Sequence, residues 1–356
     1  MSVEAEVARS YETELKAKKL ENALEKLRRT RLLNIIPGDD SSIASDIFMS
    51  YSLNCEDLIG HASNEDYEEV YLRNLKEVFG LEIVNILVDE INEEREKADR
   101  EKAKEIADKW IHEAKEVRWN EISKEQIIMS AQLYLATVEL MKKYNCNAVT
   151  MSIGPVLRIG KIPVRPPLAE MELAKSGIVT SCESLIDCLV TQLLGFYITG
   201  KLGFVGDVIT KDWLRQDLVS ATFTVGHCYA PINPYGDDRR VPYIIRSHAV
   251  TPSTVGIQVE LPLNETVTVA KLSVYDKKIS VFTGKTVDGR SLYKDFDNIA
   301  CRTKVVVKTN NEKPMKNYYK EKEIFGCHRV VFYTDFREEI KELATLIGFE
   351  VIEEDR

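Results

Sequence analysis

The sequence predicts an α/β protein in which a parallel sheet covered by helices is followed by an antiparallel, β-rich part. Two observations predict this order. Up to about residue 215, strand-like segments alternate with amphipathic helices, which is the pattern of a parallel sheet. After about residue 216, segments rich in β-branched and aromatic residues follow one another with few helices between them, which favours antiparallel pairing. The length of 356 residues fits two domains or one large one.

In the first half of the chain, hydrophobic spacing and turn residues predict the helices and strands. Leu20, Leu24 and Leu27 recur on one face of a charged helix, and Pro37 with the glycine after it ends the strand that follows. The expected helices cover residues 4–31, 65–79, 98–117, 124–144 and 184–198. The expected strands cover residues 32–36, 81–88 and 148–153, with a short strand end at 204–207 and a Gly- and Pro-rich loop at 154–167.

The second half predicts mainly strands. They are expected at residues 221–226, 243–250, 255–261, 267–275, 279–282, 303–308 and 329–333. A closing helix is expected over residues 335–347, with Gly348 as its C-cap and a last strand over residues 349–352.

The composition excludes several classes of protein. The net charge of -9 argues against a general nucleic-acid binder, which needs a basic field. No apolar run approaches the roughly 18 to 20 residues of a membrane span, and residues 1–31 lack the apolar core of a signal peptide. We therefore expect a cytoplasmic protein with no membrane partner. Seven cysteines without a CxxC pair predict neither a disulfide framework nor a structural zinc site.

Two acids and two histidines form the strongest chemical pattern in the chain. Glu183 and Asp207 lie 24 residues apart, and His227 and His328 follow them. Carboxylates and imidazoles together can hold a divalent metal and move protons beside it. Plainer roles are open for each residue: a first-turn helix acid for Glu183, a turn former for Asp207, and packed, hydrogen-bonded histidines. His248 has the same two interpretations.

Three segments resemble the superfamily of L-fucose and L-arabinose isomerases. In the segment 182–207, Glu183 opens an apolar helix, and a Thr-Gly step at Thr199 leads to the acid Asp207. The segment GHCYAP at 226–231 is similar to the next block of the superfamily, where His227 matches a metal ligand of the arabinose-type enzymes. The segment 326–355 resembles the C-terminal block, in which His328 matches the histidine that opens a strand. The resemblance covers roughly residues 31–356.

The resemblance implies a Rossmann-like parallel-sheet domain at residues 32–215 and an antiparallel β-barrel-like domain at residues 216–356. The helix at residues 1–31 then stands in place of a missing first domain. It also implies a homo-oligomer, either a trimer or a hexamer, that acts on a small-molecule sugar. The loop at 154–167 carries Arg158 and Arg165, which would favour an anionic or phosphorylated ligand; the alternative is that they only solvate the loop.

The implied activity is that of a manganese-dependent aldose–ketose isomerase working through a cis-enediol intermediate, with Mn²⁺ or another divalent cation. Glu183 and Asp207 would bind the metal, and one of them would pass a proton between C1 and C2 of the sugar. His328 would complete the ligand set. His227 would be a fourth ligand in an arabinose-like site or a substrate contact in a fucose-like one. His248 and Arg165 are the further expected substrate contacts.

The alternative to an enzyme is a non-catalytic sugar-binding or regulatory relative, or one subunit that needs a separate partner domain. The four retained ligand residues favour chemistry, whereas the missing first domain favours the alternative. The sequence does not fix which sugar is bound.

Overall fold

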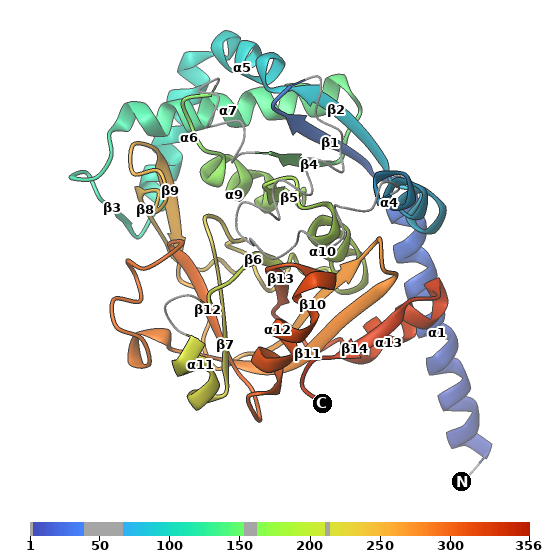
Figure 1. Cartoon of the computed structure of the whole chain (residues 1–356). Helices are drawn as coiled ribbons and strands as arrows, with labels where there is room; N and C mark the ends of the chain where they lie inside the picture. Colours follow the sequence, from blue (N-terminus) through green and yellow to red (C-terminus); the bar gives the residue numbers. More distant parts are fainter. Residues whose placement is uncertain (1–2, 39–66, 153–161, 211–213) are drawn as a thin grey trace.

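The computed structural model describes residues 3–38, 67–152, 162–210 and 214–356. It shows a mixed α/β protein with a parallel sheet of four strands, a mixed sheet of seven strands and a small sheet of three strands (Figure 1). We name these sheets A, C and B, respectively. The parallel sheet followed by a larger, mainly antiparallel sheet confirms the predicted α/β class.

Sheet A has the strand order β2-β1-β4-β5, and every pair in it is parallel. Its strands are β1 (Arg31–Ile36), β2 (Glu82–Leu87), β4 (Ala148–Met151) and β5 (Val179–Cys182). The helices of this half are α1 (Val3–Arg28), α4 (Tyr67–Asn74), α5 (Val88–Lys97), α6 (Arg100–Glu113), α7 (Lys124–Lys143) and α9 (Pro167–Lys175), and a π-helical turn, η1 (Leu75–Phe79), continues α4.

Several predicted boundaries in this half are wrong. Residues 88–97 form helix α5, which was not predicted. The helix expected at 98–117 is the shorter α6, which Asp99 caps by accepting from the amides of Glu101 and Lys102; residues 116–117 form a strand instead. Helix α9 and strand β5 were not predicted, because a nine-residue helix and a four-residue strand of sequence VTSC give little periodic signal. Most of the expected loop at 154–167, including Arg158, lies outside the described residues.

Sheet C has the strand order β10-β13-β6-β7-β12-β11-β14, and β10 also pairs with β11. Its strands are β6 (Phe204–Val208), β7 (Thr222–His227), β10 (Thr266–Ser273), β11 (Lys278–Val287), β12 (Thr303–Lys308), β13 (His328–Phe332) and β14 (Glu350–Glu353). The sheet is mixed, not purely antiparallel, because β14 joins β11 in parallel. Strand β6 precedes residue 215 but pairs with β13 and β7.

The rest of the second half forms sheet B and several helices. Sheet B contains β3 (Glu116–Val117), β8 (Tyr243–Ser247) and β9 (Val255–Val259), and its β3–β8 pair joins the two halves of the chain. The helices are α11 (Leu214–Ser220), the 3-10 turn η2 (Gly289–Ser291), α12 (Lys313–Phe325) and α13 (Arg337–Ile347). The predicted closing helix, its Gly348 C-cap and the last strand are confirmed, whereas α12 was not predicted.

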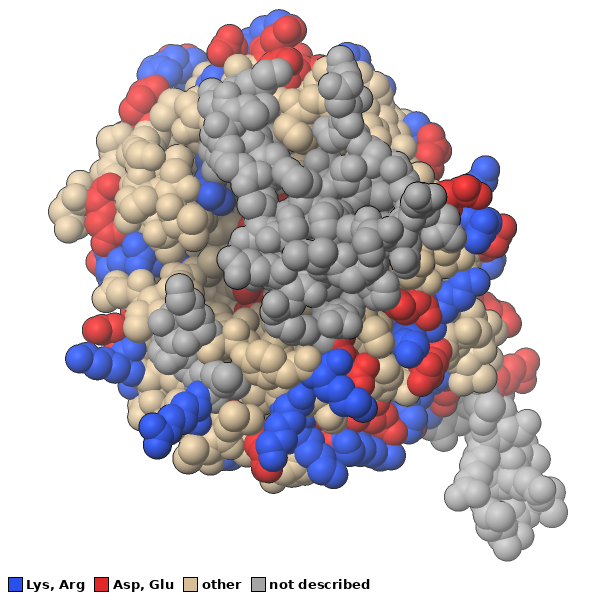
Figure 2. Space-filling view, viewed as in Figure 1, with Lys and Arg blue, Asp and Glu red and all other residues tan. Residues whose placement is uncertain are grey.

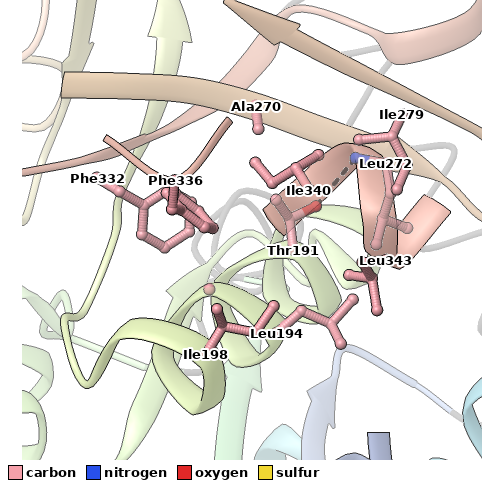
Figure 3. A pocket seen from close by; sticks show the side chains of 11 residues that line it. Thr191, Leu194, Ile198, Ala270, Leu272, Ile279, Phe332, Phe336, Ile340 and Leu343 are labelled. Carbon is pink, nitrogen blue, oxygen red and sulfur yellow. Dashed lines mark hydrogen bonds between the residues drawn. The ribbon is translucent and has the colours of Figure 1, made fainter. Parts of the chain in front are cut away.

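Helix α10 (Ile186–Thr199) is the central packing element. It contacts α1, strands β5 and β6, and strands β10 and β13 of sheet C, and most of its side chains are buried. Figure 3 shows an apolar cavity of about 20 Å³ beside it, between α10, α13 and sheet C. Thr191 is the one polar residue among those drawn, and its hydroxyl accepts from the amide of Leu272 (3.0 Å). A void of this size and lining is a packing defect that could hold about one water, not a ligand site.

The surface is of mixed charge. Around the edge of the face in Figure 2, clusters of Lys and Arg lie beside Asp and Glu. None of the helices in the described segments combines the length and apolarity that a bilayer crossing requires.

Candidate functional site

Strands of sheet C and the turn after β5 bring the four predicted residues together. Asp207 on β6 lies directly opposite His328, the first residue of β13. Asp207 also pairs with Gly226 on β7, so His227 at the end of β7 is next to it. Glu183 comes from sheet A, just after β5. The site therefore lies where the carboxyl end of β5 meets sheet C. Asp207 was expected at the end of a strand of the parallel sheet; its strand lies in sheet C instead.

Both carboxylates lie close to the imidazole of His328. Nε2 of His328 lies 3.1 Å from Oδ1 of Asp207 and 3.5 Å from Oε2 of Glu183. The rings of His227 and His328 have centroids 5.8 Å apart. Glu183, His227 and His328 each offer a ligand atom within 4.8 Å of the other two. Ligands about 2.1 Å from a shared ion are up to about 4.2 Å apart, so a small closure would allow these three atoms to share one cation.

Burial divides the four residues into two kinds. His227 and His328 are 3% and 0% exposed, whereas the side chains of Glu183 and Asp207 are 20% and 25% exposed. The imidazoles are thus enclosed, whereas the carboxylates are partly exposed.

The charges perturb one another strongly. Burial lowers the pKa of His227, but the neighbouring Cys228 and the two carboxylates outweigh burial and raise it to about 10. Burial raises the pKa of Glu183, yet its hydrogen bond to His328 and the charge of His227 bring it below its ordinary value. Burial also raises the pKa of Asp207, and Glu183 adds to this rise while the histidines oppose it. Opposed shifts in adjacent acids are typical of functional sites.

Glu183 sits in an unusual turn. Glu183 and Ser184 have φ values of 73° and 52°, the left-handed region that non-glycine residues rarely adopt. The amide of Glu183 donates to the carbonyl of Met151 (2.8 Å), and the hydroxyl of Ser184 donates to Oδ1 of Asn34 (2.8 Å). Helix α10 begins only at Ile186. The expectation that Glu183 opens the helix is therefore wrong, because Glu183 and Ser184 form a turn that precedes the first residue of α10.

Asp187, in the first turn of α10, is a buried carboxylate. It is 4% exposed, and its carboxylate accepts from the hydroxyl of Tyr71 (2.8 Å) and from the amide of Val274 (3.3 Å).

A second cluster, missed by sequence reasoning, adjoins the first. Glu170 on α9, Cys182 at the end of β5 and Cys228 after β7 are all buried, and each offers a ligand atom within 4.8 Å of the others. Sγ of Cys228 lies 3.3 Å from Nδ1 of His227. The only available signal was that each cysteine is adjacent in sequence to a predicted ligand residue.

His248 and Arg165 lie at the margin of these clusters. Nδ1 of His248 accepts from the amides of Val250 and Thr251 (both 3.2 Å), and the ring interacts with Cys228. Arg165 is 8% exposed, and its Nε and one terminal nitrogen donate to the hydroxyl of Thr251 (3.1 and 2.9 Å). Arg165 is thus buried against Thr251, which contradicts the alternative that it only solvates a loop.

A third group of potential ligands, Asp207, Cys327 and His328, overlaps the first. Cys327 is disulfide-bonded, so its sulfur is not a thiolate ligand, and Asp207 and His328 remain with the first cluster. The chain matches no protein-family model, and no curated protein resembles it at a significant level.

Proposed function

We propose that this protein is a metal-dependent aldose–ketose isomerase that acts on a small sugar. One observation carries the proposal: Glu183 and Asp207 converge on the buried imidazole of His328, with His227 beside it. Four separate segments of the chain supply these side chains. The proposal includes the finer fold description, with a Rossmann-like domain at residues 32–215 and a β-barrel-like domain at 216–356, and a homo-oligomeric assembly.

The donor set fits a divalent cation that prefers oxygen and nitrogen. Carboxylate and imidazole ligands suit Mn²⁺ better than they suit a soft metal. Nε2 of His328 is buried and faces carboxylate oxygens of Asp207 and Glu183 at 3.1 and 3.5 Å, so a cation between them would contact all three groups. Glu183, Asp207 and His328 would hold the ion, with His227 as fourth ligand or substrate contact. When bound, the metal would lower the pKa of sugar hydroxyl groups and polarise the carbonyl.

The residues themselves would perform the proton transfer. The partly exposed carboxylate of Glu183 or Asp207 would take a proton from one of the two adjacent carbons of the sugar, C1 or C2. It would return the proton to the other carbon through a cis-enediol. The buried histidines, which lie behind the carboxylates, would keep bulk water from that side of the site and fix the carboxylate positions. His248 and Arg165 would contact the sugar only if it extends beyond Cys228.

The test combines metal analysis with turnover. We would measure the metal content of the purified, untagged protein and its conversion of L-fucose, L-arabinose and D-arabinose with added Mn²⁺. Bound metal with turnover supports the proposal. Protein that binds no metal overturns it. Metal without turnover of any of these sugars would refute isomerisation of them and favour the sugar-binding alternative.

Variants assign the roles. His328→Gln is expected to lose most of the bound metal, whereas His112→Gln, the same change at an exposed histidine of α6, should retain it. Of Glu183→Gln and Asp207→Asn, the variant that keeps metal but loses turnover identifies the proton carrier. If both variants hold metal as well as the unmodified protein and still turn over, the site is wrongly assigned.

A further inference from the structure

The cluster of Glu170, Cys182 and Cys228 has the composition of a metal site of its own. Two thiols and a carboxylate lie with their ligand atoms within 4.8 Å of one another. Both cysteines are free thiols, and the three residues are 4%, 2% and 5% exposed. A cluster of this kind shares no residue with the set formed by Glu183, Asp207, His227 and His328.

One polar atom of this cluster lacks a partner in the described part of the protein. Oε2 of Glu170 is buried and has no hydrogen-bond partner among the described residues. A buried carboxyl group beside two thiols, with one oxygen that no described residue satisfies, is an arrangement that a cation would complete.

His248 does not compete as a ligand of this cluster. Its Nδ1 accepts from two backbone amides, so the neutral ring carries its proton on Nε2 and has no free lone pair for a metal. Its interaction with Cys228 makes it a partner that orients the sulfur, as groups behind metal ligands commonly do.

We propose that Glu170, Cys182 and Cys228 bind a second divalent ion of the thiophilic class, such as Zn²⁺, independently of the proposed isomerase activity. Thiolates select soft metals, whereas the carboxylate–imidazole set next to them selects hard ones. Three protein ligands leave the fourth tetrahedral position open to water or a small molecule. The chain would thus carry two different metals side by side. Cys182 and Cys228 belong to the thiol cluster, whereas the residues next to them in sequence, Glu183 and His227, belong to the carboxylate–imidazole cluster.

Cobalt spectroscopy tests this directly. The full-length protein would be stripped with a chelator under anaerobic conditions without a reductant, so that the disulfide of Cys327 stays intact, and titrated with Co²⁺. Cobalt bound by thiolates shows an intense near-ultraviolet charge-transfer band that cobalt bound by oxygen and nitrogen lacks. We expect the band in the unmodified protein and its displacement by Zn²⁺. Absence of the band in the unmodified protein overturns the proposal, whatever the behaviour of any variant.

Variants locate the band. It should disappear in the Cys182→Ser, Cys228→Ser double variant and persist in Cys188→Ser, the same change at another fully buried free thiol. A band that survives the double variant refutes the assignment. His328→Gln should remove metal from the first cluster and leave the cobalt–thiolate band unchanged, so failure of the isomerase proposal and failure of this one give different results.

Discussion

Asp217 provides a pH-dependent test of the structure that is independent of function. It lies on α11, fully buried, and its Oδ1 accepts from the hydroxyls of Thr222 (3.0 Å), Thr224 (2.9 Å) and Tyr293. Burial raises the pKa of Asp217 from 3.8 to about 6, although these three hydrogen bonds oppose the rise. The folded protein therefore holds a proton on Asp217 in a range of pH where the unfolded chain has already released it.

The sign and the size of the effect follow from linkage. Since the folded pKa lies above the unfolded one, Asp217 contributes stability below about pH 4 that is lost as the pH rises through about 6. A difference of about two pKa units at 1.36 kcal/mol each amounts to about 3 kcal/mol. Asp217→Asn removes this titration. The free energy of unfolding of the variant, relative to the unmodified protein, should therefore increase by about 3 kcal/mol between about pH 4 and pH 7.

Urea denaturation at a series of pH values measures this difference. The control is Asp238→Asn, the identical change at an exposed position, which measures the effect of removing a carboxylate that is not buried. If the Asp217→Asn difference is constant with pH, the carboxylate is not buried as the structure shows it, and the argument fails.

Three further changes probe packing, and urea or thermal unfolding measures each. Gly195→Ala places a Cβ 2.2 Å from the ring of Phe332, so we expect a loss of about 1–3 kcal/mol through overpacking; a gain from helix propensity would contradict this. Arg329→Met leaves the fully buried Glu354, 2.7 Å away, without its cation, which should cost about 3–5 kcal/mol; a loss below about 1 kcal/mol would refute burial of the pair. Ser123→Ala removes the capping box of α7 and should cost about 1 kcal/mol, and an unchanged midpoint would argue against the cap.

The sequence predicted the elements with strong local signals and missed those without them. Helix α7, with a capping box and a long buried face, and helix α13 with Gly348 as its cap were expected from spacing and end signals. Strand β5 contains four residues, VTSC, and becomes a strand only because β4 offers it a parallel partner. This strand forms through pairing with β4, and a single sequence does not reveal which strands pair.

For the candidate site, residue types were predictable but neighbours were not. Glu183, Asp207, His227 and His328 were chosen because carboxylates and imidazoles suit a metal, and the structure brings all four together. Glu170 was missed because α9 was missed. Pairings such as Asp207 opposite His328, which lie 121 residues apart, arise from strand register, and register is set by the whole sheet.

The turn at Glu183 and Ser184 shows why both clusters depend on the same part of the backbone. Two consecutive non-glycine residues with positive φ cost of order 1–3 kcal/mol each. They persist because neighbouring strands fix the turn: Met151 on β4 accepts from the amide of Glu183, and Asn34 on β1 accepts from the hydroxyl of Ser184. Because Cys182 precedes this turn and Glu183 lies within it, one strained segment directs adjacent side chains into different clusters. Relaxation of the turn would therefore move Glu183 away from His328, so the position of this carboxylate depends on the hydrogen bonds that hold the turn.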